Sequence, residues 1–133
     1  MLLKWLIKPR VMLAAVALAA PSYADDRSAL FAQWGTEAQC SGAIIKPGGT
    51  ARASAFDIRP DWLGHRNVRC RLIWSGTVST ADGLIATATG LCGEDAVRDY
   101  RLRFSLSGDE LTIIWNHQHK NGPLSRCDSA PSR

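Results

Sequence analysis

The sequence of 133 residues lacks a hydrophobic run long enough to cross a membrane as a helix. Its longest apolar run, Val11 to Ala20, has ten residues, about half of what a spanning helix needs. Three cations and no acid precede this run, and Pro21-Ser22-Tyr23-Ala24 follows it with the small-x-Ala pattern of a cleavage site. We therefore expect residues 1–24 to be a cleavable secretory signal. Residues 25–133 would form one mature domain without a membrane anchor.

A strong positive charge is also missing once the signal is set aside. Lys4, Lys8 and Arg10 lie in the signal, which leaves 13 of the 16 basic residues against 12 acidic ones. A nucleic-acid-binding domain normally carries a strongly basic face, so this balance argues against a nucleic-acid partner. Lysine is scarce too, since arginine outnumbers it 11 to 2 after residue 24. The cations of the domain are therefore mainly guanidinium groups, which bind carboxylates and phosphates as a fork.

The motifs of common hydrolases are absent. The pairs Ser75-Gly76 and Ser107-Gly108 lie in expected strands and turns rather than in a Gly-x-Ser-x-Gly elbow, and no pair of carboxylates stands out. If all four cysteines are oxidised, no thiol nucleophile remains. We therefore expect that the protein is not an enzyme and that it binds no cofactor.

Cysteine occurs four times, but never in the close pairs of a zinc site. Cys40, Cys70, Cys92 and Cys127 are 30, 22 and 35 positions apart, which predicts two disulfides in an exported chain. We expect Cys40–Cys70 and Cys92–Cys127, because a last hairpin would bring Cys127 back to the end of the strand that Cys92 terminates. The alternative is Cys70–Cys92 with Cys40–Cys127, since Cys70 lies nearly opposite Cys92 in a hairpin that turns at residues 80–83. The third pairing is also open.

Turn signals between runs of alternating residues predict an all-β fold. Residues 27–34 lack glycine and proline and are expected to form a short N-terminal helical turn that Gly35 ends. Expected strands cover residues 50–58, 67–78, 84–92, 97–106, 110–119 and 124–127, with turns at 46–49, 80–83, 107–109 and 121–122. We expect an antiparallel meander of about seven to eight strands, folded as a small barrel or a sandwich.

In the hairpin around Ser107-Gly108-Asp109, we expect the pattern of large apolar residues to determine which residues of the two strands face each other. Its facing pairs would be Leu106 with Leu111, Phe104 with Ile113, Leu102 with Trp115, and Tyr100 with His117. All these side chains would point inward, so a single register buries every large residue of both strands.

Two Arg-x-Arg pairs would then face outward, Arg69 with Arg71 and Arg101 with Arg103. One interpretation is a surface for an acidic ligand or partner. The other is a solvated surface whose arginines are neutralised by neighbouring acids, namely Glu94, Asp95, Asp99 and Glu110. Trp62 follows Pro60-Asp61 in an expected loop, which makes it the candidate for an exposed anchor residue.

His117 and His119 form the one pair that suggests a metal. On a strand, residues two apart point to the same side, so both imidazoles would be able to reach one ion. No third ligand lies near them in the sequence, and two ligands do not make a selective site. We expect no metal here. His117 would instead end the inner row beside Tyr100, and His119 would lie in water.

Several short segments resemble small two-disulfide exported proteins of Gram-negative bacteria. They are Phe31-Ala32-Gln33-Trp34-Gly35, Cys40, Phe56-Asp57-Ile58, Asp61-Trp62-Leu63, Cys70, Cys92, Ser107-Gly108-Asp109-Glu110-Leu111 and Arg126-Cys127. This resemblance covers most of residues 25–133 and implies a compartment and a fold, but no activity. The chain is also similar in size to periplasmic inhibitors of lysozymes and proteases, although the Ser-Gly-x-Gly-x-x-Tyr loop of the lysozyme inhibitors is absent.

These observations favour a non-catalytic periplasmic or secreted binding module with a protein partner, acting as an inhibitor of an envelope hydrolase. Its binding residues would be Trp62, Arg69, Arg71, Arg101 and Arg103. The rival hypothesis is a carrier of a small molecule or metal, which would use the barrel interior or the pair His117/His119. A carrier needs an unfilled interior or a third ligand. A binding module needs a filled core and an exposed apolar patch rimmed by arginine.

Overall fold

The computed structural model describes residues 27–128, so the expected signal lies outside the described residues. A 3-10 helix, η1 (Arg27–Leu30), comes first, and a short α-helix, α2 (Glu37–Ser41), follows the first strand. The strands are β1 (Gln33–Gly35), β2 (Phe56–Ile58), β3 (Trp62–His65), β4 (Val68–Ser79), β5 (Gly83–Cys92), β6 (Arg98–Ser107), β7 (Glu110–Trp115) and β8 (His119–Arg126). Within residues 27–128, no helix is both long and apolar enough to span a membrane.

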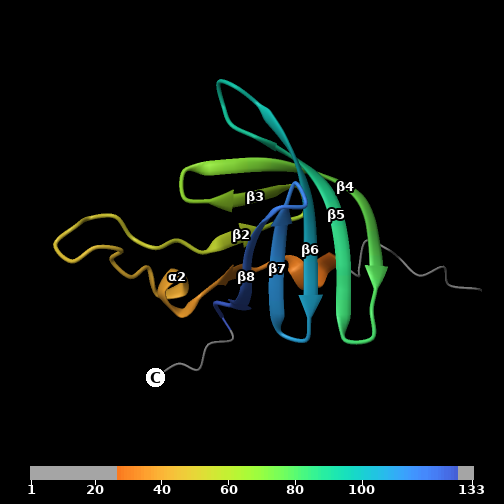
Figure 1. Cartoon of the computed structure of the whole chain (residues 1–133), viewed down its shortest axis with the longest axis horizontal. Coiled ribbons are helices and arrows are strands. Elements are labelled where there is room, and N and C mark those ends of the chain that lie inside the picture. The colour runs from red at the N-terminus through yellow and green to blue at the C-terminus, as the bar shows by residue number, and fades with distance from the viewer. Residues whose placement is uncertain (1–26, 129–133) are drawn as a thin grey trace, which may run out of the picture.

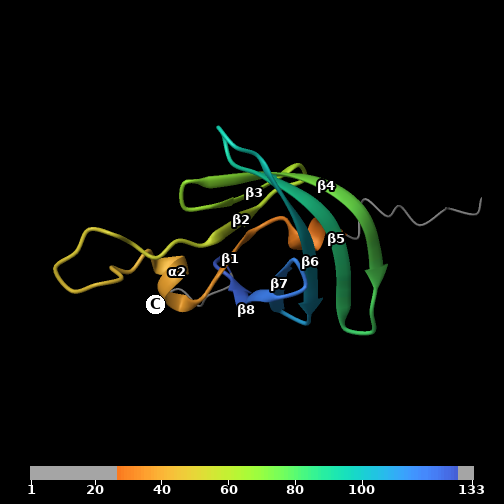
Figure 2. The same cartoon turned by 45° about the horizontal axis from the view of Figure 1, so that its top comes forward.

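The eight strands form a closed antiparallel barrel (Figure 1). Each strand pairs with the next one along the chain, and β8 closes the barrel by pairing with β1. The long strands β4 and β5 bend across the molecule (Figure 2), and β4 shifts register between Trp74 and Gly76 as a bulged strand does. The prediction of an all-β meander is confirmed, and the structure decides for the barrel.

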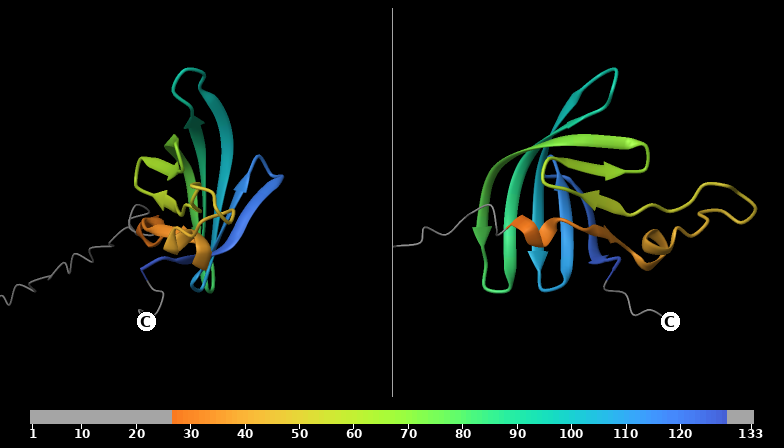
Figure 3. Two further views of the ribbon diagram at one scale, coloured as in Figure 1. Left: turned by 90° about the vertical axis from the view of Figure 1, so that its left-hand side faces the viewer. Right: turned by 180° about the vertical axis from the view of Figure 1, so that it is seen from behind.

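Side chains of all the strands fill the barrel. In β5 every second residue is buried, so that Leu84, Ala86 and Ala88 face the interior. Ala86 lies directly opposite Phe104 in the β5–β6 pair, and the large rings of Trp34, Phe56 and Phe104 are each at most 2% exposed. Figure 3 shows η1 against the concave side of the β4–β7 sheet, where Leu30 is fully buried. An interior filled by side chains is typical of eight-stranded barrels, whose diameter is just wide enough to hold them.

The start of the described chain differs from the expected helical turn. Only Arg27–Leu30 is helical, and Trp34 belongs to β1. The Nε1 atom of Trp34 donates a hydrogen bond to the carbonyl oxygen of Leu30 at 2.8 Å. The prediction is therefore right for the first half of residues 27–34 and wrong for the second, because the Trp34 ring enters the core through a strand.

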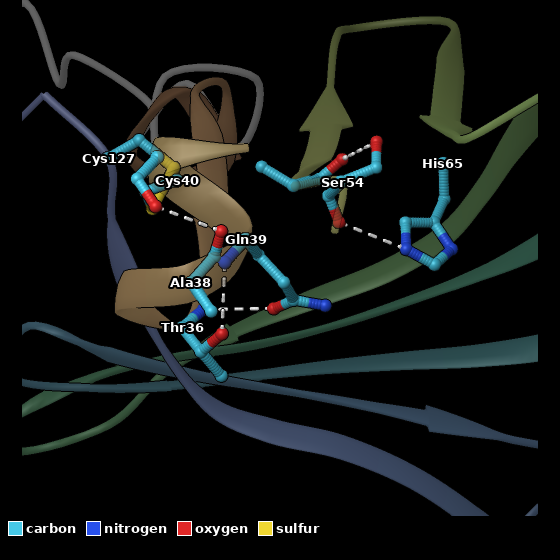
Figure 4. Close-up of a disulfide and its surroundings, with 9 residues drawn as sticks. Thr36, Ala38, Gln39, Cys40, Ser54, His65 and Cys127 are labelled. Carbon is cyan, nitrogen blue, oxygen red and sulfur yellow. Dashed lines mark hydrogen bonds between the residues drawn. A yellow bond between two sulfur atoms is a disulfide. The ribbon is translucent and has the colours of Figure 1, made fainter. Parts of the chain in front are cut away.

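Helix α2 was not expected from the sequence, although its capping signals are there. Thr36 Oγ1 accepts from Gln39 N at 3.2 Å, and Gln39 Oε1 accepts from Thr36 N at 2.8 Å (Figure 4). Gly42 ends the helix in the left-handed conformation with φ of 67°. These caps hold a helix of only five residues beside the barrel.

The register of the β6–β7 hairpin is confirmed for three of its four expected pairs. Leu106 faces Leu111, Phe104 faces Ile113 and Leu102 faces Trp115. The expected pair of Tyr100 and His117 is wrong, because the chain turns at residues 116–118, where Gln118 N donates to Trp115 O.

The Asn121-Gly122 pair does not form the expected turn. It lies inside β8, where the pairing with β7 shifts register between Leu111 and Ile113. Gly122 has φ of 134°, a conformation that suits an irregular strand position as well as a turn. The last hairpin therefore begins five residues earlier in the chain than the Asn-Gly signal indicates.

The favoured disulfide pairing is wrong, and the alternative is found. The structure joins Cys40 to Cys127 and Cys70 to Cys92. Cys70 and Cys92 lie directly opposite each other in the β4–β5 pair. Cys127 follows β8, whose seam with β1 leads to Cys40 in α2 (Figure 4). Both bridges are compatible with an oxidising extracellular or periplasmic location.

Candidate functional site

The four predicted arginines lie on the outer face of the barrel, and all four are exposed. Arg69 faces Gly64 of β3, and Arg71 lies between Trp62 of β3 and Leu91 of β5. On β6, Arg101 faces Thr89 and Arg103 faces Thr87 of β5. Because β4 and β6 both flank β5, the structure brings the two Arg-x-Arg pairs onto one continuous surface.

None of these four arginines forms an ion pair within residues 27–128. Acids nevertheless lie near both Arg-x-Arg pairs, since Glu94 lines the same groove as Arg69, and Asp99 the same pocket as Arg101. In contrast, Arg59 Nε lies 2.8 Å from Asp57 Oδ1 and is engaged within the protein. The exposed guanidinium groups of Arg71, Arg101 and Arg103 are able to donate to carboxylates of another molecule.

Trp62 does not lie in a loop as expected, because it begins strand β3 and is only half-buried. The guanidinium of Arg69 lies over its ring, 4.2 Å from the centroid, in a cation–π contact. A Cβ atom at Gly64 would approach Trp62 Cζ3 to 2.9 Å, so the glycine allows the indole to lie along the strand. The Trp62 ring therefore packs against the Arg69 guanidinium and restricts its position, and it does not project into solvent as an isolated side chain.

A groove of about 480 Å³ adjoins this pair. Strand register aligns Gln33, Asp57, Gly64 and Arg69 across β1 to β4 on its floor. Ser54, His65, Arg66 and Glu94 are among its walls. Among the residues that line this groove, only Trp62 and Arg69 are predicted from the sequence to bind a partner, because the alignment of the others depends on the register of short strands that no turn signal fixes.

His65 lies at one wall of the groove and is half-buried. Its ring stacks on Phe56 with centroids 4.0 Å apart, and Nε2 lies 3.1 Å from the Ser54 carbonyl oxygen (Figure 4). That contact requires the proton on Nε2, because a carbonyl oxygen only accepts. Burial lowers the pKa of His65 below its ordinary value of 6.5, the charge of Arg66 lowers it further, and the Ser54 bond opposes both effects.

We expect the stability of the protein to depend on pH through His65. With its pKa lowered by folding, the neutral ring contributes stability that is complete above pH 6.5 and is lost as pH falls through the folded pKa. Urea unfolding of the protein and of His65→Gln, at about pH 7.5 and about pH 5.5, measures this loss. The variant should lose less stability between the two pH values, and equal losses would contradict the assignment.

A second groove of about 370 Å³ crosses the outer faces of β5, β6 and β7. Ile85, Thr87, Thr89, Arg101, Arg103 and Ile114 are among its lining residues. Beside it on β4, Ile73 is 49% and Val78 is 63% exposed. We call this surface, formed by Ile73, Val78, Ile85, Ile114, Arg71, Arg101 and Arg103, the arginine face. It is a mixed surface rather than an apolar patch rimmed by arginine, because Arg103 lies between Thr87 of β5 and Ile114 of β7.

The expected place of His117 in the inner row beside Tyr100 is wrong, whereas His119 is exposed as expected. His117 lies in the β7–β8 turn with φ of 62°, and His119 begins β8 opposite Trp115, so the two do not share one strand. Within residues 27–128, no group of three or more His, Cys, Asp or Glu residues is placed to hold a metal ion.

Comparison with known proteins gives no match to a family model, to a curated protein or to a solved structure.

Proposed function

We propose that this chain is a non-catalytic binding module of the periplasm or the extracellular space, and that it inhibits an envelope hydrolase by binding an acidic surface of that enzyme. The observation that carries this proposal is the arginine face, where exposed arginines that form no ion pair within residues 27–128 lie among exposed and half-buried aliphatic side chains. Arginine is among the side chains that most often contribute a large share of the binding free energy at protein interfaces.

The filled interior supports a binding module over a carrier. Trp34, Phe56 and Phe104 occupy the inside of the barrel, where a carried small molecule would have to lie. Two disulfides also brace the scaffold, and a braced surface loses little conformational freedom on binding. The same disulfides support the proposed compartment, because oxidising conditions preserve them.

The charge pattern supports an acidic partner. Arg101 and Arg103 line a groove together with Ile85 and Ile114, so a partner that offers carboxylates beside an apolar contact would fit both features. Arg69 lies two residues before Arg71 on β4, and its guanidinium lies over the Trp62 ring. A partner that covers the arginine face would therefore also reach this guanidinium.

A pull-down from envelope extract with the disulfide-intact exported protein tests the proposal. We expect one partner to be retained, and Arg101→Gln/Arg103→Gln and Trp62→Ala each to weaken retention about tenfold or more, in proportion to the lost interface contacts. Arg98→Gln is the matched control, because it removes an exposed arginine of β6 that lies outside the arginine face. If no protein is retained, and native mass spectrometry shows a bound metal or small molecule, the carrier hypothesis replaces this one.

A further inference from the structure

Between α2 and β2 the chain leaves the barrel as a protruding arm, which we define as residues 43–53. Figures 1 and 3 show this segment extending away from the strands of the barrel. All its residues except Ala53 are exposed. A connection of this length in a small domain is usually functional or without fixed structure.

The arm has fixed structure, because it folds back on itself as a narrow two-stranded ribbon. Ile45 N donates to Ala51 O at 2.9 Å, Ala53 N donates to Ala43 O at 2.7 Å, and Ile44 and Arg52 form an antiparallel bridge. At the tip, Gly49 N donates to Lys46 O at 3.0 Å and closes the turn. These bonds set the shape of the arm before any partner is met.

The base of the arm is fixed to the barrel. Arg52 Nη1 donates to the Gly42 carbonyl oxygen at 3.1 Å, which ties the returning strand to the end of α2. The preceding turn of α2 carries Cys40, whose disulfide to Cys127 joins it to the chain just after β8. The arm is therefore preorganised, and ordering it costs little when it binds.

The chemistry of the arm is apolar and cationic. Ile44 is 50% and Ile45 is 49% exposed, and successive residues of a strand point to opposite faces. Lys46 and Arg52 supply two cations, while the sequence has no acidic residue between Glu37 and Asp57. An isolated ribbon in water gains nothing from two exposed isoleucines, whereas a concave apolar site with acidic edges would take up both.

We propose that this arm is the part of the molecule that enters the substrate cleft of the inhibited enzyme, with Ile44 and Ile45 in apolar subsites and Lys46 and Arg52 against acidic groups at the rim. The inference rests on the proposed function and names the element that blocks the enzyme. A cleft is favoured over a flat surface because the ribbon is narrow and presents isoleucines on both faces. It is favoured over a membrane because two isoleucines and two cations give only weak interfacial binding.

The position of the arm agrees with this assignment. Ser54 and Ala55, which follow the arm directly, are part of the wall of the groove that holds Trp62 and Arg69. An enzyme that takes the arm into its cleft would therefore place the rim of the cleft over that groove. Acidic groups on the rim would then meet Arg69 at the base of the arm, as well as Lys46 nearer the tip.

Site-specific photocrosslinking in intact cells tests the placement of the arm. The exported protein carries p-benzoylphenylalanine in place of Ile44, and the matched control carries it in place of Val78, which is similarly exposed but lies on the arginine face. We expect the Ile44 probe to crosslink to residues that line the substrate cleft of one hydrolase. The Val78 probe should crosslink to the same enzyme outside its cleft.

Inhibition of that purified hydrolase provides the second measurement. Ile44→Ser/Ile45→Ser should raise the inhibition constant about 100-fold, since each half-exposed isoleucine contributes about a tenfold change in affinity when it is buried. Thr50→Ala, an exposed position of the same arm, is the control and should change it less than about threefold. Circular dichroism of each variant verifies that the barrel is retained.

The outcomes separate this inference from the proposed function. If the enzyme is captured and inhibited, but crosslinks outside its cleft or tolerates the double isoleucine variant, the arm proposal is wrong and the binding module stands. If the Ile44 probe crosslinks to lipid, or the protein binds vesicles of phosphatidylethanolamine and phosphatidylglycerol through the arm, a membrane is the occupant and the arm proposal is wrong. If neither probe captures a protein, both proposals fail.

Discussion

Replacing Cys40 and Cys127 by serine is expected to lower the free energy of unfolding by about 4–5 kcal/mol, which is a large part of the stability of a domain of this size. The bridge spans 87 positions of sequence, so its removal releases a long loop in the unfolded chain. The folded state is affected as well, because the bridge lies next to the seam that closes the barrel. There Trp34 pairs with Arg126 and Gly35 with Ser125, and Cys127 N donates to Gln33 O at 2.9 Å.

The matched control for this variant is Cys70→Ala/Cys92→Ala. That bridge spans 22 positions and crosses one long strand pair, so its removal is expected to cost about 3 kcal/mol and to leave the closing seam intact. Urea unfolding gives the free energies, and hydrogen exchange of the β1 and β8 amides reports on the seam. A Cys40/Cys127 variant with the wild-type midpoint and protected β1 amides would show that the bridge does not hold the barrel closed.

Trp34→Ala is expected to lower the free energy of unfolding by about 3–5 kcal/mol. The side chain is fully buried and donates from Nε1 to the Leu30 carbonyl oxygen, so the variant leaves a cavity and removes one of the two hydrogen bonds to that oxygen, the other coming from Ala32 N. The Arg126 guanidinium also lies over the Trp34 ring, 5.1 Å from its centroid. One ring thus connects η1, β1 and β8.

Two further variants separate the contributions of Trp34. Trp34→Phe retains most of the ring but removes the donor, so we expect a loss of about 1–3 kcal/mol. Trp62→Ala removes the same ring from the half-buried outer face and should cost less than Trp34→Ala. Urea midpoints with unchanged m-values are the measurement. If Trp62→Ala were the more destabilising of the two alanine variants, the assignment of Trp34 as the central core residue would be incorrect.

The sequence by itself determined the features that depend on neighbouring residues. Leu106 and Leu111 flank a short turn, and from that pair a period of two sets the inner faces of β6 and β7 as far as Trp115. The same period places Arg69, Arg71, Arg101 and Arg103 outside. The prediction from this period fails after Trp115. The chain turns at residues 116–118, and the Asn121-Gly122 pair, which predicts a turn, lies instead at an irregular position in β8.

Only the tertiary structure decided which distant segments meet. The disulfide pairing followed from barrel closure, because β1–β8 contact brings Cys127 to Cys40 and the long β4–β5 pair sets Cys70 opposite Cys92. The groove at Trp62 and Arg69 required the register of β1 to β4, three of which have four residues or fewer. In such short strands alternation fits several registers equally well, and only burial of the shared core selects one. The arm at residues 43–53 is likewise a feature of the tertiary structure, because its exposure depends on how the strands before and after it close the barrel.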